Sequence, residues 1–424
     1  MQNLAKELVT AILASQVKRL RQRRQFKVVA IAGSIGKTST KLAVVKVLEQ
    51  KYRVRSQEGN YNHLITVPLV FFGQKLPSLR NPLAWLRVFW NNERLIGEEY
   101  PYDIVVVELG TDGPGQLAEF HAYLKADIGV LTAITHEHMK FFTDLDDVAK
   151  EELELTKLSE KVIVNKDLTS GKYLKDIKNP LITYGLKQPA NVQLDNLKFD
   201  NFASDFVVRA TDKPTVEATY ELITEPLLYG VTAAVAVGHQ FDMTAEQIER
   251  GIGKIKPVNG RMQLLRGVNG SSIIDDTYNA SPEATKAALS TLYRLKADHK
   301  IAILGNMNEL GTYSEAAHRG IGQYCDPKQL DLVVTLGPDA NKYLAEEAES
   351  KGCTVSRFDD PYTLGDYLKV VIAKDTIILA KGSQNRVFAE EAVKTILKNS
   401  ADSTKLVRQS PEWLKIKKKA FSPQ

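Results

Sequence analysis

A glycine-containing segment near the amino terminus carries residue types that can hold a polyphosphate. An apolar run over 27–32 leads directly into Gly33-Ser34-Ile35-Gly36-Lys37-Thr38-Ser39. Glycines let backbone N–H groups approach an anion, the amino end of a following helix adds a positive dipole, and a lysine and a hydroxyl can reach the terminal phosphates and Mg²⁺. The standard motif has four residues between its glycines, whereas this loop has two. We predict a variant nucleoside-triphosphate loop formed by Gly33, Ser34, Gly36, Lys37, Thr38 and Ser39.

A carboxylate ends another apolar run. Glu108 lies near the end of a predicted strand over 103–110. Ligands of parallel α/β sheets bind at the carboxyl ends of the strands, and Mg²⁺ takes one or two carboxylates together with phosphate oxygens. We therefore predict that Glu108 and Thr38 ligate Mg²⁺; a helix-capping role for Glu108 is the alternative. His136 and His138 follow the next strand, where contact with the nucleotide's metal or phosphate is favoured over a zinc site because no cysteine is near.

The elements that position these residues alternate between strands and helices. Before residue 256, buried strands are predicted over 27–32, 103–110, 128–134 and 161–165, with an Ala/Val-rich helix over 229–238. A Pro/Gly-containing link over 256–262 interrupts the pattern, which restarts with strands over 272–276, 300–305, 330–336 and 376–380 and helices between them. The alternation predicts an α/β fold with parallel sheets.

We expect four segments. A basic amphipathic helix over 1–25 precedes a central P-loop ATPase domain over 26–256, and a C-terminal Rossmann-like α/β domain over 257–400 precedes a basic tail over 401–424. A chain of 424 residues is too long for one core. Only Cys325 and Cys353 are present, which excludes a disulfide framework and fits a reducing compartment. No run of 18 apolar residues and no signal-peptide pattern is found, so a cytoplasmic protein is expected.

Positive charge gathers at the two ends of the chain, whose net charge is +5. Residues 1–25 predict a helix with one apolar side, and residues 401–424 place lysines beside Trp413; the apolar positions of the helix are Leu4, Leu8, Ile12, Val17 and Leu20. Either end can meet a protein partner or the anionic inner face of a membrane. The favoured alternative is a docked helix and a solvated tail. The rest of the chain is not basic, which argues against nucleic-acid binding.

Several motifs taken in order resemble the Mur ligases, over about residues 27–395. The similarity is greatest to the branch that adds D-alanyl-D-alanine to a UDP-muramoyl-tripeptide, because the long segments 275–282 and 305–311 separate this branch from folylpolyglutamate synthases. The segments that carry the resemblance are 32–39, Asn60-Tyr61-Asn62 with Pro68, 108–110, His138, Gly260-Arg261, 275–282, 304–311 with Ser314 and His318, and 381–383.

The resemblance implies an ATP- and Mg²⁺-dependent amide ligase of peptidoglycan precursor synthesis. The γ-phosphate of ATP passes to a donor carboxylate, and the amine of an amino acid or dipeptide attacks the resulting acyl phosphate. The alternatives are an ATP-binding subunit that needs a partner chain for substrate recognition, or a ligase that acts on a donor without UDP.

The resemblance also assigns roles to single residues. Lys37 matches the residue that holds the β- and γ-phosphates, His138 a ligand of a second Mg²⁺, and Arg261 a contact to the γ-phosphate. Asp275 and Asn279 match positions that meet the ribose and the adenine. The substrate-side positions are Asn60, Asn62, Asn308, Glu309, His318 and Lys381. For Glu309 and His318, the alternative is that they are ordinary polar residues of a surface loop and helix.

The sequence departs from the family pattern at two points that bear on the site. Relatives carry a carbamylated, metal-binding lysine in the segment that matches 149–154, where we align Glu152; a shift by one turn offers Lys150 instead. Glu152 is preferred, since its carboxylate needs no modification to bind Mg²⁺. Relatives also begin with a domain that holds the UDP-sugar, whereas residues 1–26 are too few to form one. Beside the favoured docked helix, the open alternatives are that the basic helix binds the donor's diphosphate, docks to a partner that does, or brings the enzyme to a lipid-linked donor.

Overall fold

The computed structural model describes residues 2–57, 61–136, 141–200, 202–221, 225–256 and 258–421. These residues form two compact units. Unit 1 comprises Met1–Thr135 and Phe141–Ile255, and unit 2 comprises His136–Lys140 and Lys256–Gln424.

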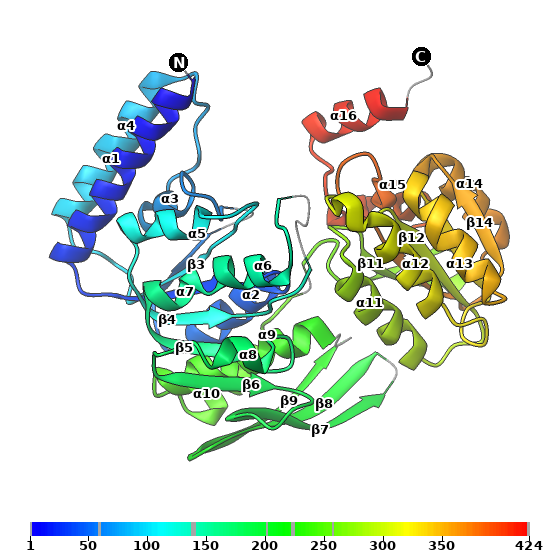
Figure 1. Ribbon diagram of the computed structural model, residues 1–424, viewed down its shortest axis with the longest axis horizontal. Coiled ribbons are helices and arrows are strands. Elements are labelled where there is room, and N and C mark those ends of the chain that lie inside the picture. Colours follow the sequence, from blue (N-terminus) through cyan, green and yellow to red (C-terminus); the bar gives the residue numbers. More distant parts are fainter. Residues whose placement is uncertain are drawn as a thin grey trace. The chain divides into compact units, whose positions relative to one another are not determined.

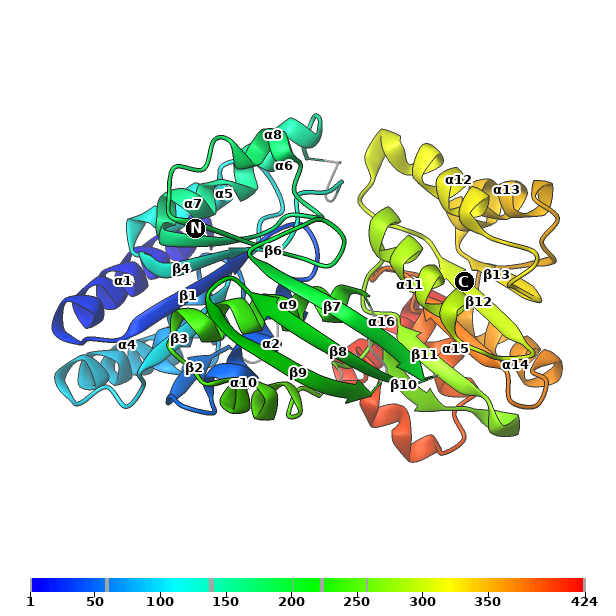
Figure 2. The ribbon, with the colours of Figure 1, turned by 90° about the horizontal axis from the view of Figure 1, so that it is seen from below.

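Unit 1 is built on a nine-stranded sheet whose first seven strands in spatial order run parallel and whose last pairings are antiparallel. Figure 2 shows the long strands β7, β8 and β9 at one edge of this sheet. The strands in spatial order are β2 (Val54–Ser56), β3 (Ile104–Glu108), β1 (Lys27–Ala32), β4 (Ala126–Leu131), β5 (Ser159–Asn165), β6 (Leu181–Gly185), β7 (Val192–Asp200), β8 (Ala203–Ala210) and β9 (Lys213–Glu221).

Helices cover both faces of this sheet (Figure 1). Alternate residues of β1, such as Val29 and Ile31, enter one core with α2 (Lys37–Leu48), α9 (Glu225–Gln240) and α10 (Ala245–Ile252). The opposite face carries α5 (Gln116–Glu119), α6 (Leu145–Glu152) and α7 (Glu154–Leu158), with α8 (Gly171–Leu174) farther along the chain. Since successive side chains of a strand point to opposite faces, strands covered on both sides read as continuous apolar runs, and this is why they could be predicted.

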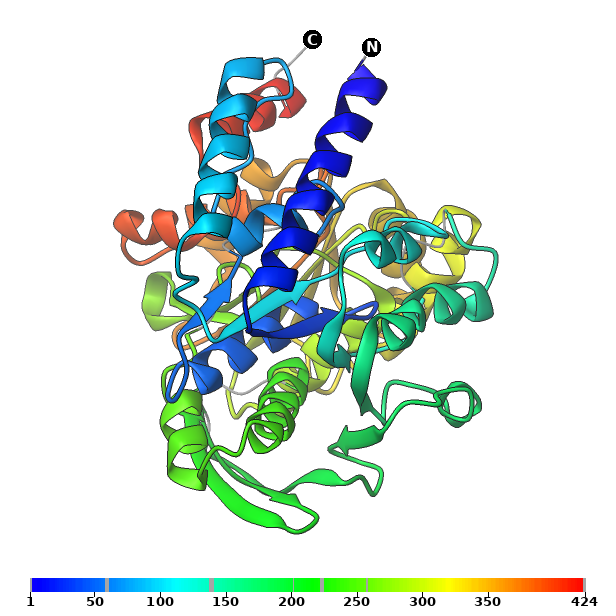
Figure 3. The ribbon, with the colours of Figure 1, turned by 90° about the vertical axis from the view of Figure 1, so that its left-hand side faces the viewer.

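The amino-terminal residues form a helix that docks within unit 1. Helix α1 (Gln2–Arg23) lies beside α4 (Pro82–Gly97), as Figure 3 shows, and packs with α3 (Val67–Phe72). The Gln16 side chain joins the two long helices, because it donates to Glu93 Oε1 at 2.8 Å and accepts from Asn92 Nδ2 at 2.8 Å. Arg19 forms an ion pair with Glu93.

The buried side of α1 differs in part from the predicted one. Val9, Leu13, Val17 and Leu20 are buried, whereas Leu8, expected on the apolar side, is 63% exposed. The face is selected by Trp85 and Val88 of α4 and by Leu69 of α3, which are distant in the sequence. These contacts bury one side of α1 against α3 and α4. Among the described residues, no helix has the length and apolar character needed to cross a bilayer.

Unit 2 contains a six-stranded sheet in which only the edge strand β10 is antiparallel. Its strands in spatial order are β10 (Gln263–Arg266), β11 (Ser272–Asp276), β15 (Ile377–Lys381), β12 (Lys300–Gly305), β13 (Leu332–Leu336) and β14 (Val355–Phe358). The helices are α11 (Pro282–Arg294), α12 (Ser314–Tyr324), α13 (Ala345–Ser350), α14 (Pro361–Val371), α15 (Ala389–Thr395) and α16 (Pro411–Phe421). The predicted α/β class with two mainly parallel sheets is confirmed.

The position of α1 gives a prediction in which two leucines of one helix are compared. Leu13→Ala should lower the free energy of unfolding by about 2–4 kcal/mol, because it leaves a cavity among packed side chains. Leu8→Ala, on the exposed side, should change it by less than about 0.5 kcal/mol. Urea unfolding followed by circular dichroism measures both. A larger cost for Leu8 would mean that the helix docks through the face expected from the sequence.

Candidate active site

The phosphate loop lies at the carboxyl end of β1, between β3 and β4. Gly33 has a φ of +129° and Gly36 a φ of +82°, both in the region that favours glycine. A Cβ on Gly33 would lie 2.8 Å from the backbone nitrogen of Ala133 and closer still to the Thr132 hydroxyl. Gly36 is the residue that immediately precedes α2. Both glycines are therefore required by the backbone path from strand to helix.

Side chains of the neighbouring strand end hold this loop. The Thr132 hydroxyl lies 2.6 Å from the carbonyl oxygen of Ile35. The backbone N–H of Ser34 donates to the carbonyl of Ala133 at 3.0 Å, and the Ser34 hydroxyl accepts from the N–H of Thr135 at 3.0 Å. The Ser34 hydroxyl, predicted to contact the nucleotide, therefore also fixes the loop to the segment that follows β4.

The Lys37 ammonium lies over the loop itself. It donates to the carbonyl oxygens of Gly33 and Ser34, the second at 3.0 Å. A lysine at this place puts a positive charge where the motif binds the terminal phosphates. Thr38 and Ser39 follow in the first turn of α2 and are half-buried.

Glu108 and Thr38 meet as the sequence predicts. Glu108 ends β3 opposite Ile31 of β1, and its Oε1 accepts from the Thr38 hydroxyl at 3.1 Å. Its other oxygen lies 3.3 Å from the Lys41 ammonium, with both side chains almost fully buried. The Glu108 N–H donates to the side chain of Gln57 at 3.1 Å.

Sequence reasoning missed Lys41 and Gln57. Lys41 lies three residues beyond Thr38 on α2, so both face the same side of the helix, and that spacing was the available signal. Gln57 follows the short edge strand β2, and nothing in the sequence connects it with Glu108.

The oxygens of Thr38 and Glu108 suit Mg²⁺, which prefers hard oxygen ligands and takes several more from water and phosphate. No cluster of three or more His, Cys, Asp or Glu that could hold a metal ion is found in the part of the chain that the structure describes. The predicted residues His138 and Asn60 lie outside the described residues.

Neighbouring residues at the end of α6 have different environments. Glu151 is a structural residue, since its carboxylate accepts from the N–H groups of Gly115 and Leu117, both at 2.6 Å. Glu152 is also buried, whereas Lys150 is exposed. The choice between Glu152 and Lys150 as a metal ligand stays a prediction.

Asn62 lies at the same sheet edge as Glu108. Its carbonyl oxygen accepts from the N–H of Gly110 at 2.8 Å, and a Cβ on Gly110 would lie 2.5 Å from Asn62 Nδ2. The described segments at the carboxyl ends of β1, β2 and β3 therefore bring together Gly33, Ser34, Gly36, Lys37, Thr38, Asn62 and Glu108.

In unit 2, a second group of predicted residues surrounds the loop after β11. The Arg261 guanidinium carbon lies 4.1 Å from the centre of the Tyr278 ring. Lys381, at the end of β15, pairs with Asp276 at 2.7 Å and donates to the carbonyl oxygen of Asn279 at 2.6 Å. Lys381 is buried, so it supports the loop that carries Asn279 from within the fold.

Asp275 lies beneath this loop and is fully buried. Its Oδ1 accepts from the hydroxyl of Thr277 at 2.6 Å and from the Thr277 N–H at 3.2 Å. Burial raises the pKa of Asp275 to about 7, although the bonds from Thr277 oppose this rise. In this arrangement Oδ1 of Asp275 is engaged by the loop itself.

The predicted substrate residues of the loop after β12 separate into two kinds. Asn308 is half-buried and donates to the carbonyls of Gln384 and Asn385, and Glu309 is exposed with a φ of +65°. His318 is fully buried: its Nδ1 contacts the carbonyl of Ser314 at 2.8 Å, and its Nε2 accepts from the N–H of Met307 at 3.0 Å. Burial also lowers the pKa of His318, which favours the neutral ring. His318 therefore supports the loop, and the expectation that it faces the substrate is corrected.

Comparisons with known proteins find similarity over most of the chain. The family model "Mur ligase middle domain" matches residues 90–238, and "Mur ligase, glutamate ligase domain" matches residues 260–384. A Bacillus subtilis (strain 168) protein named UDP-N-acetylmuramoyl-tripeptide–D-alanyl-D-alanine ligase is 27% identical over 383 residues, which cover 88% of this chain and 76% of the relative.

Solved structures show the same fold. MurF from Acinetobacter baumannii has a TM-score of 0.76 at 20% identity, over 91% of this chain and 80% of its own. The MurF ligase of Thermotoga maritima in complex with ADP has a TM-score of 0.74 at 23% identity, over 91% of this chain and 83% of its own.

The close approach of Gly33 to β4 gives a prediction about nucleotide affinity. Gly33→Ala should weaken ADP binding at least about tenfold, because the loop cannot keep its path with a Cβ at this position. Adding Thr132→Ala should not restore binding, since the backbone nitrogen of Ala133 still lies 2.8 Å from that Cβ. Isothermal titration calorimetry measures the affinity. Gly97→Ala, which meets nothing within 4 Å, is the control. Unchanged affinity in Gly33→Ala would contradict the assignment of this loop.

Asp275 gives a prediction about pH. With a pKa of about 7 in the folded chain, against 3.8 ordinarily, the folded state keeps a proton that the unfolded state loses as pH rises through this window. Stability therefore falls between about pH 4 and 7, by up to about 4 kcal/mol from this group. Asp275→Asn should make the decline shallower. Urea unfolding at pH 5 and pH 7 measures the slope, and the exposed Asp298→Asn should leave it unchanged.

Proposed function

The chain belongs to the Mur ligase family, whose two domain models cover more than half of it, and we propose that this ATP-dependent ligase joins D-alanyl-D-alanine to a muramoyl-tripeptide donor in peptidoglycan precursor synthesis. One observation carries the proposal: Lys37, Thr38 and Glu108 meet at the ends of adjacent parallel strands around a glycine-dependent loop. The names of the relatives support the choice of substrates.

In unit 1, the proposed chemistry is charge neutralisation and positioning. The loop amides and Lys37 hold the β- and γ-phosphates, since phosphoryl transfer depends mainly on positioning and compensation of charge. Thr38 and Glu108 are the residues that would hold Mg²⁺, which when bound neutralises phosphate charge. His138 and Glu152 are proposed for a second Mg²⁺. The γ-phosphoryl group then passes to the donor carboxylate and leaves ADP, with Asn62 proposed on the donor side.

In unit 2, Arg261 and residues of the segments after β11 and β12 are proposed to meet ligands. Arg261 is assigned to the γ-phosphate, and Asn279, with Asp275 beneath it, to the adenosine. Asn308 and the exposed Glu309 are assigned to the amine of the acceptor, since a carboxylate suits an ammonium group. The amine attacks the acyl phosphate, an amide forms, and inorganic phosphate leaves. Use of ATP and the two free cysteines favour a cytoplasmic enzyme.

The test is phosphate release from Mg-ATP with UDP-muramoyl-tripeptide, with and without D-alanyl-D-alanine. We expect release that requires both substrates, together with the joined product by mass spectrometry. Lys37→Ala should lower kcat at least about a hundredfold, because it removes a cation from the transferring phosphate. Lys46→Ala, on the same helix but paired with Glu49, should keep activity.

Two other outcomes have distinct meanings. Tight ATP binding without turnover would contradict the proposed donor and favour a donor without UDP or a partner chain that supplies recognition. Turnover that persists in Lys37→Ala would contradict the assignment of the phosphate loop.

A further inference from the structure

The residues after α15 return to the loop that carries Asn279. The Arg408 side chain is 6% exposed and makes four hydrogen bonds. Two go to the Glu390 carboxylate, both at 2.8 Å, and two go to backbone carbonyls, of Tyr278 at 3.0 Å and of Thr277 at 2.6 Å. Arg408 has a φ of +54°, a backbone conformation that costs energy for a residue other than glycine. This strained backbone conformation coincides with the burial of the Arg408 side chain.

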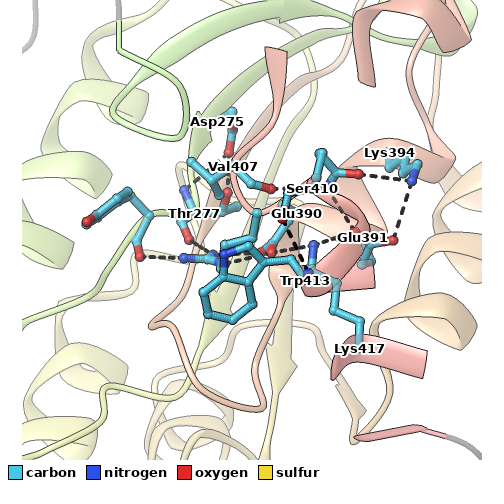
Figure 4. Close-up of polar contacts among 12 residues, drawn as sticks. Asp275, Thr277, Glu390, Glu391, Lys394, Val407, Ser410, Trp413 and Lys417 are labelled. Carbon is cyan, nitrogen blue, oxygen red and sulfur yellow. Dashed lines mark hydrogen bonds and ion pairs between the residues drawn. The ribbon is translucent and has the colours of Figure 1, made fainter. Parts of the chain in front are cut away.

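A second cation anchors the same segment farther along. Lys417 of α16 is fully buried, and its ammonium lies 2.8 Å from Glu390 and 2.7 Å from Glu391 (Figure 4). Burial alone would raise the pKa of Glu391, but hydrogen bonds from Lys417 and Gln409 outweigh it, and the pKa is lowered. Both glutamates belong to the first turn of α15, where the helix dipole also favours negative charge. The basic tail expected to be solvated is therefore fixed by buried ion pairs.

Val407 connects the tail to the Arg261 turn. A Cβ on Gly260, the residue before Arg261, would lie 2.7 Å from Val407 and 3.1 Å from the Tyr278 nitrogen. The Tyr278 N–H donates to the Gly260 carbonyl at 2.9 Å, and the Arg261 guanidinium lies over the Tyr278 ring. Val407 therefore lies against the turn that carries Arg261, and Arg408 binds the loop that carries Asn279.

We propose that residues 407–417 form a C-terminal clamp, with Arg408 as a positioning residue that holds Tyr278, and through it Arg261 and Asn279, for the nucleotide. The inference rests on the proposed function, because Arg261 and Asn279 are assigned to ATP there. An arginine suits this place, since its planar fork serves a carboxylate and two carbonyls at once. A lysine at 408 keeps the charge but cannot make all four contacts.

The expected kinetic effect is selective. Arg408→Lys should raise the KM for ATP about tenfold, since the loop residues are less often in place, while the KM for D-alanyl-D-alanine stays within about twofold. Arg408→Ala should have a larger effect in the same direction. Lys417→Met removes the distal anchor without touching the loop and should have a smaller one. Lys419→Ala, exposed on the same helix, is the matched control.

A second measurement does not depend on turnover. Amide hydrogen exchange of the full-length protein should become faster in 275–282 for Arg408→Lys. Little change is expected in β12, since the hydrogen bonds and ion pairs of Arg408 and Lys417 in the described part of the chain go to other segments. ADP binding measured by calorimetry should weaken in parallel. If the unmodified protein lacks ligase activity, the proposed function fails, and the exchange and ADP measurements still test the clamp.

Specific outcomes would overturn the clamp. Unchanged exchange in 275–282 and an unchanged KM for ATP in Arg408→Lys and Lys417→Met would do so. Equally faster exchange throughout unit 2 would also do so, because it would show general destabilisation. If Arg408→Ala does not fold, the other two variants decide the question.

Discussion

Unit 1 depends on the compensation of one buried carboxylate. Glu108 stands at the end of a strand that is covered on both faces, where an uncompensated charge would be strongly unfavourable. Lys41 and Thr38 provide the compensation from the first turns of α2. The helix that follows the phosphate loop is thus tied to the neighbouring strand by charge as well as by packing. The oxygens of Glu108 and Thr38 are also suitable Mg²⁺ ligands, so the fold and the proposed chemistry share these atoms.

Unit 2 uses the same principle beneath its loops. Asp276 is matched by Lys381, and Glu390 by Arg408 and Lys417, and all five side chains lie in or near the interior. Removal of one member of such a buried pair typically costs about 3–5 kcal/mol, because the other charge remains without compensation. Pairs of this kind fix a backbone in one arrangement. This is the property that loops need when they present arginine, asparagine and glutamate side chains to a ligand.

The sequence predicted features that depend on local pattern. The strand over 27–32, the glycine loop and the Glu108 strand end could all be recognised, because burial on both faces leaves a continuous apolar run and phosphate binding requires particular residue types. The insertion of β15 between β11 and β12 could not, since strand order depends on contacts between distant segments. The prediction that Leu8 lies on the buried side of α1 was wrong for the same reason, because contacts with α3 and α4 determine which side of α1 is buried. The expectation of a solvated tail was also wrong. Lys417 is buried against Glu390 and Glu391, which lie more than 20 residues earlier in the chain, so no local pattern connects them.

A residue that matches a family motif can have one of two roles: it can contact a ligand, or it can support a neighbouring residue that contacts the ligand. His318 and Lys381 carry the resemblance as clearly as Asn308 and Asn279, yet the first two are buried with their polar atoms engaged inside the fold. Lys37, Arg261, Asn279 and Asn308 are half-buried, and Glu309 is exposed. Burial thus separates the two roles where residue type and spacing do not. Glu108, Glu152 and Asp275 are exceptions, since they are buried and are also proposed to meet a metal ion or the nucleotide. For Glu108, Lys41 compensates the buried charge.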